Sequence, residues 1–190
     1  LCDPRRSLVR HGFVDKLCRK SVATKYLWLL SDMLLYGTRA HDSAQCYLSR
    51  CILLKACRLS GDVSAHVPRK RASCAFTLFS PSKSFVLLAP NPKERDLWMA
   101  DIERCIVSLQ PFGGSKAPVE LAPVWMPDSA SPHCGVCAST FSLLKRRHHC
   151  RACGDLVCRS CSENRQVLAH ISTTPVRVCD VCVANAPRRK

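Results

Sequence analysis

The chain has 190 residues, enough for one or two domains, and 47% of them are hydrophobic, as in globular and not in disordered proteins. No apolar run reaches the roughly 20 residues of a membrane-spanning helix, and the N-terminus lacks the long apolar core of a secretory signal. The formal net charge of +15 comes from both ends of the chain and indicates an anionic partner, either nucleic acid or an anionic membrane leaflet. Because the first residue is Leu1, we expect a fragment or a processed chain.

The first 110 residues are predicted to form a series of short strands followed by one helix. The strands are rich in Leu, Val, Phe and Tyr and are bounded by turn residues. Ser31-Asp32 and residues 81–83 are predicted to form tight turns between strands, and residues 66–71 a basic loop. The predicted strands are residues 12–18, 26–30, 33–37, 46–54, 75–79 and 84–89.

The helix begins after Asn91, which is a favoured N-cap and is followed by Pro92, a favoured first residue. Its apolar side chains recur at helical spacing and form one stripe that must be buried against the strands. We expect Trp98 to pack in the core. The stripe consists of Trp98, Ile102, Cys105, Ile106 and Leu109. These elements predict an α+β fold with an N-terminal domain at residues 8–112, a linker at 113–124 that is rich in small residues and Pro, and a C-terminal domain at 125–190.

Cysteine is unusually frequent, with 15 residues, and eight of them form four Cys-x-x-Cys pairs with the spacing C-x2-C-x12-C-x2-C-x4-C-x2-C-x17-C-x2-C. Without a secretory signal, metal binding is favoured over disulfides. Eight thiolates supply two closed tetrahedral Zn²⁺ sites, which are structural because no position is left for a catalytic water. The spacing leaves open whether adjacent or alternate pairs share an ion. The eight ligands are Cys134, Cys137, Cys150, Cys153, Cys158, Cys161, Cys179 and Cys182.

A basic run, Arg146-Arg147-His148-His149-Cys150-Arg151, surrounds the third cysteine of this set. In an extended strand successive side chains alternate, so one face carries Arg147, His149 and Arg151 and the other carries Arg146 and His148. Arginine forks match phosphate oxygens, and histidines donate hydrogen bonds and gain charge near pH 6.5. The run therefore predicts a phosphate pocket, and lowering the pH from about 7.5 to 6 is expected to strengthen binding.

Two adjacent leucines, Leu143 and Leu144, precede the basic run. An apolar loop tip with a basic rim favours shallow insertion into an anionic bilayer. Phe141, close to them, is expected to pack in the core instead.

These motifs make residues 125–182 closely similar to the FYVE zinc finger family. The chain has Trp125-Met126-Pro127-Asp128, Arg146 to Arg151 and Arg177-Val178-Cys179, which match the family's W-x-x-D, R-[RK]-H-H-C-R and R-V-C motifs. The resemblance implies phosphatidylinositol 3-phosphate as the ligand, with phosphate contacts from the side chains of Arg146, Arg147, His149 and Arg151. It implies inositol contacts from Asp128 and His148, completion of the pocket by Arg177, and membrane insertion of Leu143 and Leu144. It also implies alternate pairing, with Cys134, Cys137, Cys158 and Cys161 on one ion and Cys150, Cys153, Cys179 and Cys182 on the other.

The N-terminal domain resembles a pleckstrin homology (PH) domain, a seven-stranded barrel capped by a helix that carries a Trp, here Trp98. Segments 16–20, 31–37 and 81–85 look like the phafin family, in which this domain precedes a FYVE finger. The alternative is the C-terminal lipid-binding part of a Rho-family guanine-nucleotide exchange protein. By the same resemblance, the loop after the first strand is a second candidate lipid site, with Lys16, Arg19, Lys20 and Lys25.

Together these features predict a phosphoinositide-binding adaptor and not an enzyme, since the sequence shows no catalytic constellation. The resemblance implies a cytoplasmic protein, peripheral on early endosomes or lysosomes, that acts in endocytic or lysosomal trafficking or autophagy. The basic run, and histidines that are not needed as zinc ligands, disfavour a RING-type ubiquitin ligase. The lack of a recognition helix or an aromatic platform disfavours nucleic-acid binding. Protein partners and a homodimer are left open.

Overall fold

The computed structural model describes residues 3–39, 45–110 and 119–186. The expected domain boundary at residues 112–113 and the first half of the expected linker, residues 113–118, lie outside the described residues. We refer to residues 3–110 as the barrel domain and to residues 119–186 as the finger.

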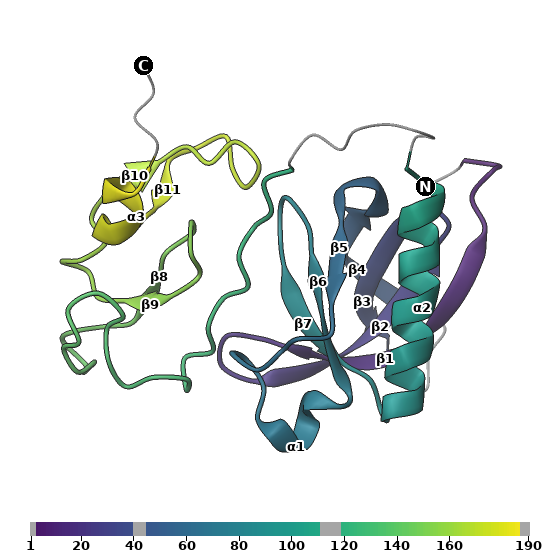
Figure 1. Cartoon of the computed structure of the whole chain (residues 1–190), viewed down its shortest axis with the longest axis horizontal. Coiled ribbons are helices and arrows are strands. Elements are labelled where there is room, and N and C mark those ends of the chain that lie inside the picture. The colour runs from purple at the N-terminus through teal and green to yellow at the C-terminus, as the bar shows by residue number, and fades with distance from the viewer. Residues whose placement is uncertain (1–2, 40–44, 111–118, 187–190) are drawn as a thin grey trace.

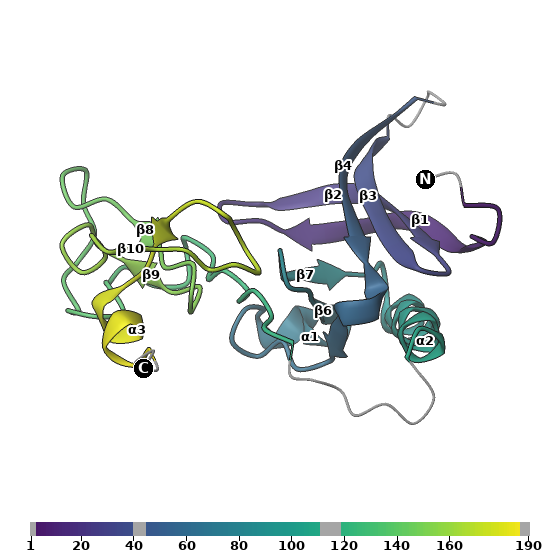
Figure 2. The ribbon, with the colours of Figure 1, turned by 90° about the horizontal axis from the view of Figure 1, so that it is seen from above.

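The barrel domain is a seven-stranded antiparallel sheet in the strand order β4-β3-β2-β1-β7-β6-β5. Strand β1 is central because it pairs with β2 along its length and with β7 at Asp15 and Lys16. The sheet folds over so that β1–β4 lie across β5–β7 (Figures 1 and 2). The strands are β1 (Leu8–Leu17), β2 (Val22–Leu30), β3 (Met33–Arg39), β4 (Cys46–Leu53), β5 (Arg58–Ser60), β6 (Ala75–Phe79) and β7 (Phe85–Leu88).

Helix α2 (Pro92–Ser108) begins as the sequence predicts, because the Asn91 side chain accepts a hydrogen bond from the backbone N–H of Glu94 at 2.9 Å. Four of the five residues of the predicted apolar stripe are buried, and the fifth, Leu109, is partly buried against the core; Trp98 is 2% exposed. Asp101, which is not part of the apolar stripe, is also buried, and Arg10 of β1 pairs with its carboxylate at 2.5 Å. The helix contacts β1, β5, β6 and the short 3-10 helix η1 (Leu54–Ala56), and so closes one end of the folded sheet.

Two short elements were not predicted as such. Strand β5 has only three residues, too few for an alternating pattern to be visible. The basic segment expected as a loop contains one helical turn, α1 (Arg69–Ala72).

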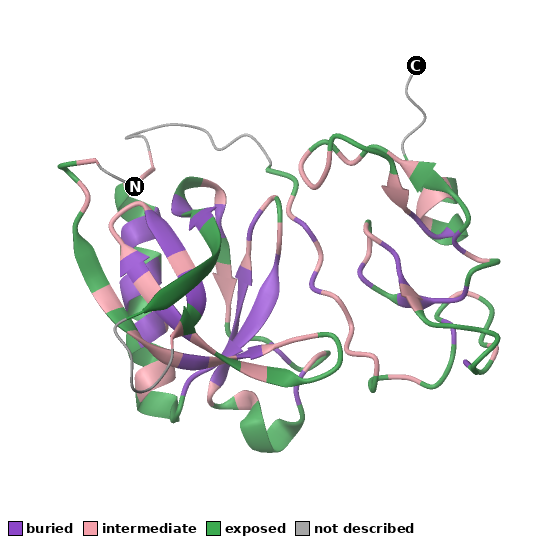
Figure 3. Cartoon of the chain, turned by 180° about the vertical axis from the view of Figure 1, so that it is seen from behind, coloured by how far each residue is buried: buried purple, intermediate pink, exposed green. Residues whose placement is uncertain are grey.

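The finger has little regular structure and a small core that includes four of its zinc-ligand cysteines. Two antiparallel pairs cross it: β8 (His148–His149) with β9 (Leu156–Val157), and β10 (Arg165–Gln166) with β11 (Val176–Arg177). Helix α3 (Asp180–Ala184) follows the seventh cysteine. Buried residues follow the barrel strands and the sheet-facing side of α2, whereas in the finger they gather around β8 and β9 (Figure 3).

Candidate metal centres and basic pocket

The eight paired cysteines gather into two clusters, and within each cluster the four Sγ atoms all lie within 4.8 Å of one another. The first and third Cys-x-x-Cys pairs share one cluster and the second and fourth share the other, which is the alternate pairing that the resemblance implies. The clusters are Cys134, Cys137, Cys158 and Cys161, and Cys150, Cys153, Cys179 and Cys182.

The size and the donor set of both clusters fit zinc. A Zn–S bond of about 2.3 Å sets the edge of a sulfur tetrahedron at roughly 3.8 Å. The Sγ atoms of Cys137 and Cys158 are 3.8 Å apart, and those of Cys150 and Cys182 are 3.9 Å apart. Four soft sulfur ligands leave no open coordination position, so the finger carries two structural Zn²⁺ ions as its cofactors.

Backbone amides support the metal-binding sulfurs. The N–H groups of Val136 and Cys158 point at the Cys134 sulfur at 3.4 and 3.3 Å, and the N–H of Cys179 points at the Cys150 sulfur at 3.3 Å. A hydrogen bond with the Cys153 thiol, together with backbone N–H groups, lowers the pKa of Cys150 to about 4. These donors stabilise the thiolate form that binds zinc.

One face of the basic run lines a hollow of about 420 Å³. Arg146 and His148 lie on this face, as the alternation along the strand predicts, and Arg177 joins them from β11. Two further arginines, Arg159 and Arg165, complete a lining without acidic residues. The sequence analysis missed Arg159 and Arg165 because they lie between the motifs. Arg165 reaches the pocket because the pairing of β10 with β11 sets it directly opposite Arg177. We call this hollow the basic pocket; it is lined by Leu144, Arg146, His148, Arg159, Arg165 and Arg177.

The other face of the run carries His149 and Arg151 and is turned toward the W-x-x-D segment. His149 is 2% exposed, stacks on the Trp125 ring with centroids 4.9 Å apart, and its Nε2 hydrogen-bonds to the Met126 carbonyl oxygen at 2.7 Å. The Arg151 guanidinium lies 4.6 Å from the Trp125 centroid, and the Asp128 carboxylate lies 3.8 Å from His149. Asp128, His149 and Arg151 therefore lie on the opposite side of the strand from the basic pocket. The predicted ligands do not all line one site.

Burial changes the expected charge of the two histidines. It lowers the pKa of His148 below its usual value of 6.5, and four nearby arginines, Arg177 foremost, lower it further. Burial is also the main cause that lowers the pKa of His149. In the free protein, therefore, both gain their charge at lower pH than the sequence analysis expects.

The leucine tip is exposed as predicted, with Leu143 91% and Leu144 99% exposed. Phe141 is buried in the finger core, also as predicted, and the Arg147 guanidinium covers its ring at 4.9 Å. Leu144 lines the basic pocket, so the apolar tip and the arginines form one continuous surface.

Of the four basic residues predicted as a barrel lipid site, Lys16 and Arg19 line one hollow of about 250 Å³, which Lys20 and Lys25 do not line. Lys16 is 8% exposed inside the barrel mouth, whereas Lys20 is exposed. Arg19 pairs with Asp128 of the finger at 3.5 Å, and the Lys25 ammonium donates to the Thr38 hydroxyl at 3.0 Å.

Within the described ranges, no helix combines the length and the apolarity that crossing a bilayer requires.

Comparison with known proteins gives the same two domains in the same order. Residues 8–107 match the PH domain family and residues 124–188 match the FYVE zinc finger family. The chain is 35% identical to the uncharacterized protein ZK632.12 of Caenorhabditis elegans over 93% of this chain and 65% of that protein. It is 34% identical to pleckstrin homology domain-containing family F member 2 of Mus musculus, over 94% of this chain and 71% of that protein.

Member 1 of the same family from Homo sapiens is 35% identical over 94% of this chain and 63% of that protein. The chain thus spans 63–71% of the length of these three relatives. Since the similarity runs through both domains and not through the barrel alone, the chain belongs to the phafin family, the pleckstrin homology domain-containing family F, with a PH domain followed by a FYVE zinc finger.

Proposed function

We propose that this protein is a membrane adaptor that binds phosphatidylinositol 3-phosphate through its finger. The observation that carries the proposal is the position of Leu144, which is 99% exposed and also lines the basic pocket. An exposed leucine beside an arginine-lined hollow fits a lipid ligand, because the leucine can enter the acyl region while the arginines bind the headgroup phosphate.

The basic pocket supplies the groups that a phosphorylated inositol needs. Arg146 and Arg177 offer guanidinium forks for phosphate, and His148 offers a ring nitrogen for a hydroxyl or a phosphate oxygen. We extend this set with Arg159 and Arg165, which line the same hollow. The headgroup contacts expected of Asp128, Arg147, His149 and Arg151, all of which lie outside this hollow, stay predictions, as does the lipid site of Lys16, Arg19, Lys20 and Lys25.

The two matched families are binding modules, which supports the proposal that the protein is an adaptor and not an enzyme. Zinc in closed four-sulfur sites supports the same reading, because such ions hold structure and do not activate water. We further propose that the protein works on the cytoplasmic face of endosomes or lysosomes, in endocytic or lysosomal trafficking or autophagy.

The test is vesicle sedimentation of the zinc-loaded chain across all phosphoinositides, with the pocket variant Arg146→Ala/Arg177→Ala. We expect binding to 3-phosphorylated vesicles, and a loss of about tenfold or more in the variant. Arg69→Ala is the matched control, since Arg69 is an exposed arginine on α1 of the barrel domain. Equal binding to all anionic vesicles, or an equal loss in the control, would contradict the proposal.

A further inference from the structure

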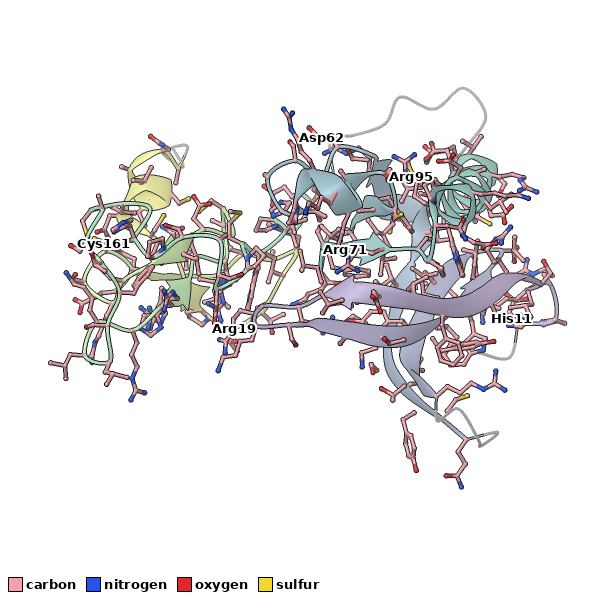
Figure 4. The ribbon with its side chains drawn as sticks, turned by 90° about the horizontal axis from the view of Figure 1, so that it is seen from below. His11, Arg19, Asp62, Arg71, Arg95 and Cys161 are labelled. Carbon is pink, nitrogen blue, oxygen red and sulfur yellow. The ribbon has the colours of Figure 1, made fainter. Side chains whose placement is uncertain are left out.

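A hollow of about 470 Å³ lies on the barrel domain, and all of its lining residues belong to that domain. Its floor is the strand pair β5 and β6, and its wall is the loop of residues 62–66. Figure 4 shows Asp62 of this loop well apart from Arg19, which lies where the β1–β2 hairpin meets the finger. The volume is in the range of ligand sites in proteins. We call this hollow the β5 pocket; its polar and aromatic lining consists of Arg58, Ser60, Asp62, Ser64, His66, Thr77 and Phe79.

Two buried polar atoms of the β5 pocket, the Thr77 hydroxyl oxygen and His66 Nδ1, have no hydrogen-bond partner among the described residues. Thr77 is 1% exposed and lies in the middle of β6, on the face opposite to the core residues Phe76 and Leu78. A buried polar group without a partner destabilises a fold and is rare in native proteins. The two atoms therefore point to a ligand that supplies their partners.

The lining of the β5 pocket matches an uncharged ligand that carries an amide group. An amide has one acceptor and N–H donors, and a threonine hydroxyl can serve either. Burial lowers the pKa of His66, so its ring is neutral at neutral pH and Nδ1 donates or accepts according to the tautomer. The pocket has one cation, Arg58, and one anion, Asp62, so its charge selects neither a phosphate nor an ammonium group.

The wall of the β5 pocket is held in place by hydrogen bonds within the loop. The Asp62 carboxylate accepts the Ser64 N–H at 3.0 Å and the Ser64 hydroxyl at 2.8 Å, and the Ser60 hydroxyl accepts the Asp62 N–H at 3.1 Å. At the other end, the Arg58 guanidinium lies over the Phe79 ring at 5.0 Å. The pocket is therefore formed before a ligand binds, which lowers the entropic cost of binding.

Strand β5 gives the pocket an open edge. It stands last in the sheet order and pairs with β6, so its outer edge has no strand partner among the described residues. An extended peptide can pair with such an edge through its backbone and place alternate side chains in a neighbouring pocket. Because β5 has only three residues, backbone pairing alone is weak, and the pocket must add affinity and specificity. A small molecule in the pocket would leave the edge unpaired, so the open edge favours a peptide.

We propose that β5 and the β5 pocket form a docking site for an extended peptide segment of a partner protein. The peptide pairs with β5 and places the amide of an Asn or Gln side chain against Thr77 and His66. The site shares no residue with the basic pocket and does not rest on the function proposed for it.

The test is a selection on the full zinc-loaded chain from display libraries of heptapeptides with Gln or Asn fixed at the centre, beside a matched library with Ala fixed there. The tightest peptide is then titrated against the parent, Thr77→Val and His66→Leu. Each variant is expected to weaken binding by about three- to tenfold, because each removes one hydrogen bond. Replacing the central amide residue of the peptide by Ala is expected to weaken binding at least as much.

Two variants serve as controls. Thr173→Val changes an exposed threonine of the finger, and Arg146→Ala/Arg177→Ala changes the basic pocket. Both are expected to bind the peptide as the parent does, so a failure of the lipid site and a failure of the peptide site can be told apart.

Melting temperature and amide NMR separate loss of binding from loss of folding. Thr77→Val is expected to melt no lower than the parent, because it removes a buried hydroxyl that has no partner. The bound peptide is expected to protect backbone amides of Arg58, Leu59 and Ser60 against hydrogen exchange. Equal binding by the parent, Thr77→Val and His66→Leu would overturn the proposal, as would a bound peptide that leaves the β5 amides unchanged or libraries with a central amide that give no tighter peptide than the Ala library.

Discussion

The Arg19 guanidinium lies 3.5 Å from the Asp128 carboxylate, and the Arg19 carbonyl oxygen accepts the Asp128 backbone N–H at 2.8 Å. This double contact joins the β1–β2 loop of the PH domain to the W-x-x-D motif of the FYVE finger. Asp128 is the acidic residue expected to accept hydrogen bonds from the inositol ring. In the docked arrangement its carboxylate is therefore already engaged by an arginine of the neighbouring domain.

If a headgroup needs Asp128, it must displace Arg19. We expect Arg19→Ala to strengthen binding to phosphatidylinositol 3-phosphate vesicles by about two- to fivefold, the range of a partly exposed ion pair. The measurement is vesicle sedimentation at fixed ionic strength.

The adjacent Lys20→Ala is the control, because it removes one exposed positive charge without touching Asp128. It is expected to weaken binding slightly through lost attraction to the anionic surface. If Arg19→Ala also weakens binding, Arg19 contacts the lipid itself and does not compete with it.

The sequence alone predicts those elements whose structure depends on neighbouring residues. Asn91 and the apolar stripe predict α2, and strict alternation predicts that His148 and His149 point to different sides of β8. The two four-sulfur clusters follow from cysteine spacing, whereas their crossed pairing needed the family resemblance.

Contacts between distant parts of the chain could not be predicted in this way. The Arg19–Asp128 contact joins residues of different domains, and no local pattern marks it. Arg165 reaches the basic pocket because β10 and β11 pair in a register that sets it opposite Arg177. The three residues of β5 are too few to show a period, so their pairing with β6 had no signal in the sequence.

Removal of zinc is expected to unfold the finger and leave the barrel domain folded. The finger's core is built largely around its metal-binding cysteines, whereas the barrel has a larger core around Phe76 and Trp98. Amide NMR spectra recorded during chelation are expected to lose the finger's dispersed signals and retain those of the barrel. Metal analysis is expected to give two zinc ions for each chain before chelation, and vesicle binding is expected to disappear with them.

Cys150→Ser provides the matched genetic version of this experiment. Cys150 is buried and belongs to one cluster, so the change is expected to release one ion and to disrupt the finger. Cys46→Ser changes an exposed cysteine outside both clusters and is expected to keep both ions. Retention of two ions by Cys150→Ser would contradict the assignment of this ligand.

Gly154 fixes the W-x-x-D segment on the finger and is expected to tolerate no side chain. Its φ of +86° favours glycine, and an added Cβ would clash with the Val124 carbonyl oxygen. Its own carbonyl oxygen accepts the Met126 N–H at 3.1 Å. Gly154→Ala is therefore expected to lower the free energy of unfolding by about 1–3 kcal/mol, measured by chemical denaturation. Gly135→Ala, at a position without positive φ and with its nearest neighbour at 3.4 Å, is the control and is expected to cost less.

The leucine tip allows membrane insertion to be separated from headgroup recognition. Leu143→Ala/Leu144→Ala is expected to leave the melting temperature unchanged, because both side chains are more than nine-tenths exposed. Vesicle affinity is expected to fall by about tenfold or more, since burying a leucine in the bilayer contributes about 1.5–3 kcal/mol when complete.

Binding of a short-chain, water-soluble phosphatidylinositol 3-phosphate is expected to stay unchanged in this variant, because the basic pocket keeps its four arginines and His148. Val107→Ala removes another exposed apolar side chain, on α2 of the barrel domain, and is expected to change neither measurement. If the leucine variant loses affinity for the soluble lipid to the same extent as for vesicles, the leucines shape the pocket and do not enter the membrane.

Arg165 tests whether the pocket extends beyond the recognised motifs. Its side chain lines the same hollow as Arg146 and Arg177, and it belongs to none of the FYVE motifs. Arg165→Gln is expected to weaken vesicle binding by about three- to tenfold, as for an exposed charge that meets a phosphate. The affinity is measured at several salt concentrations, and its salt dependence is expected to become shallower because one cation no longer faces the anionic surface. Arg69→Gln is the matched control on the barrel domain, and an equal effect of the two changes would show that Arg165 contributes only to overall charge.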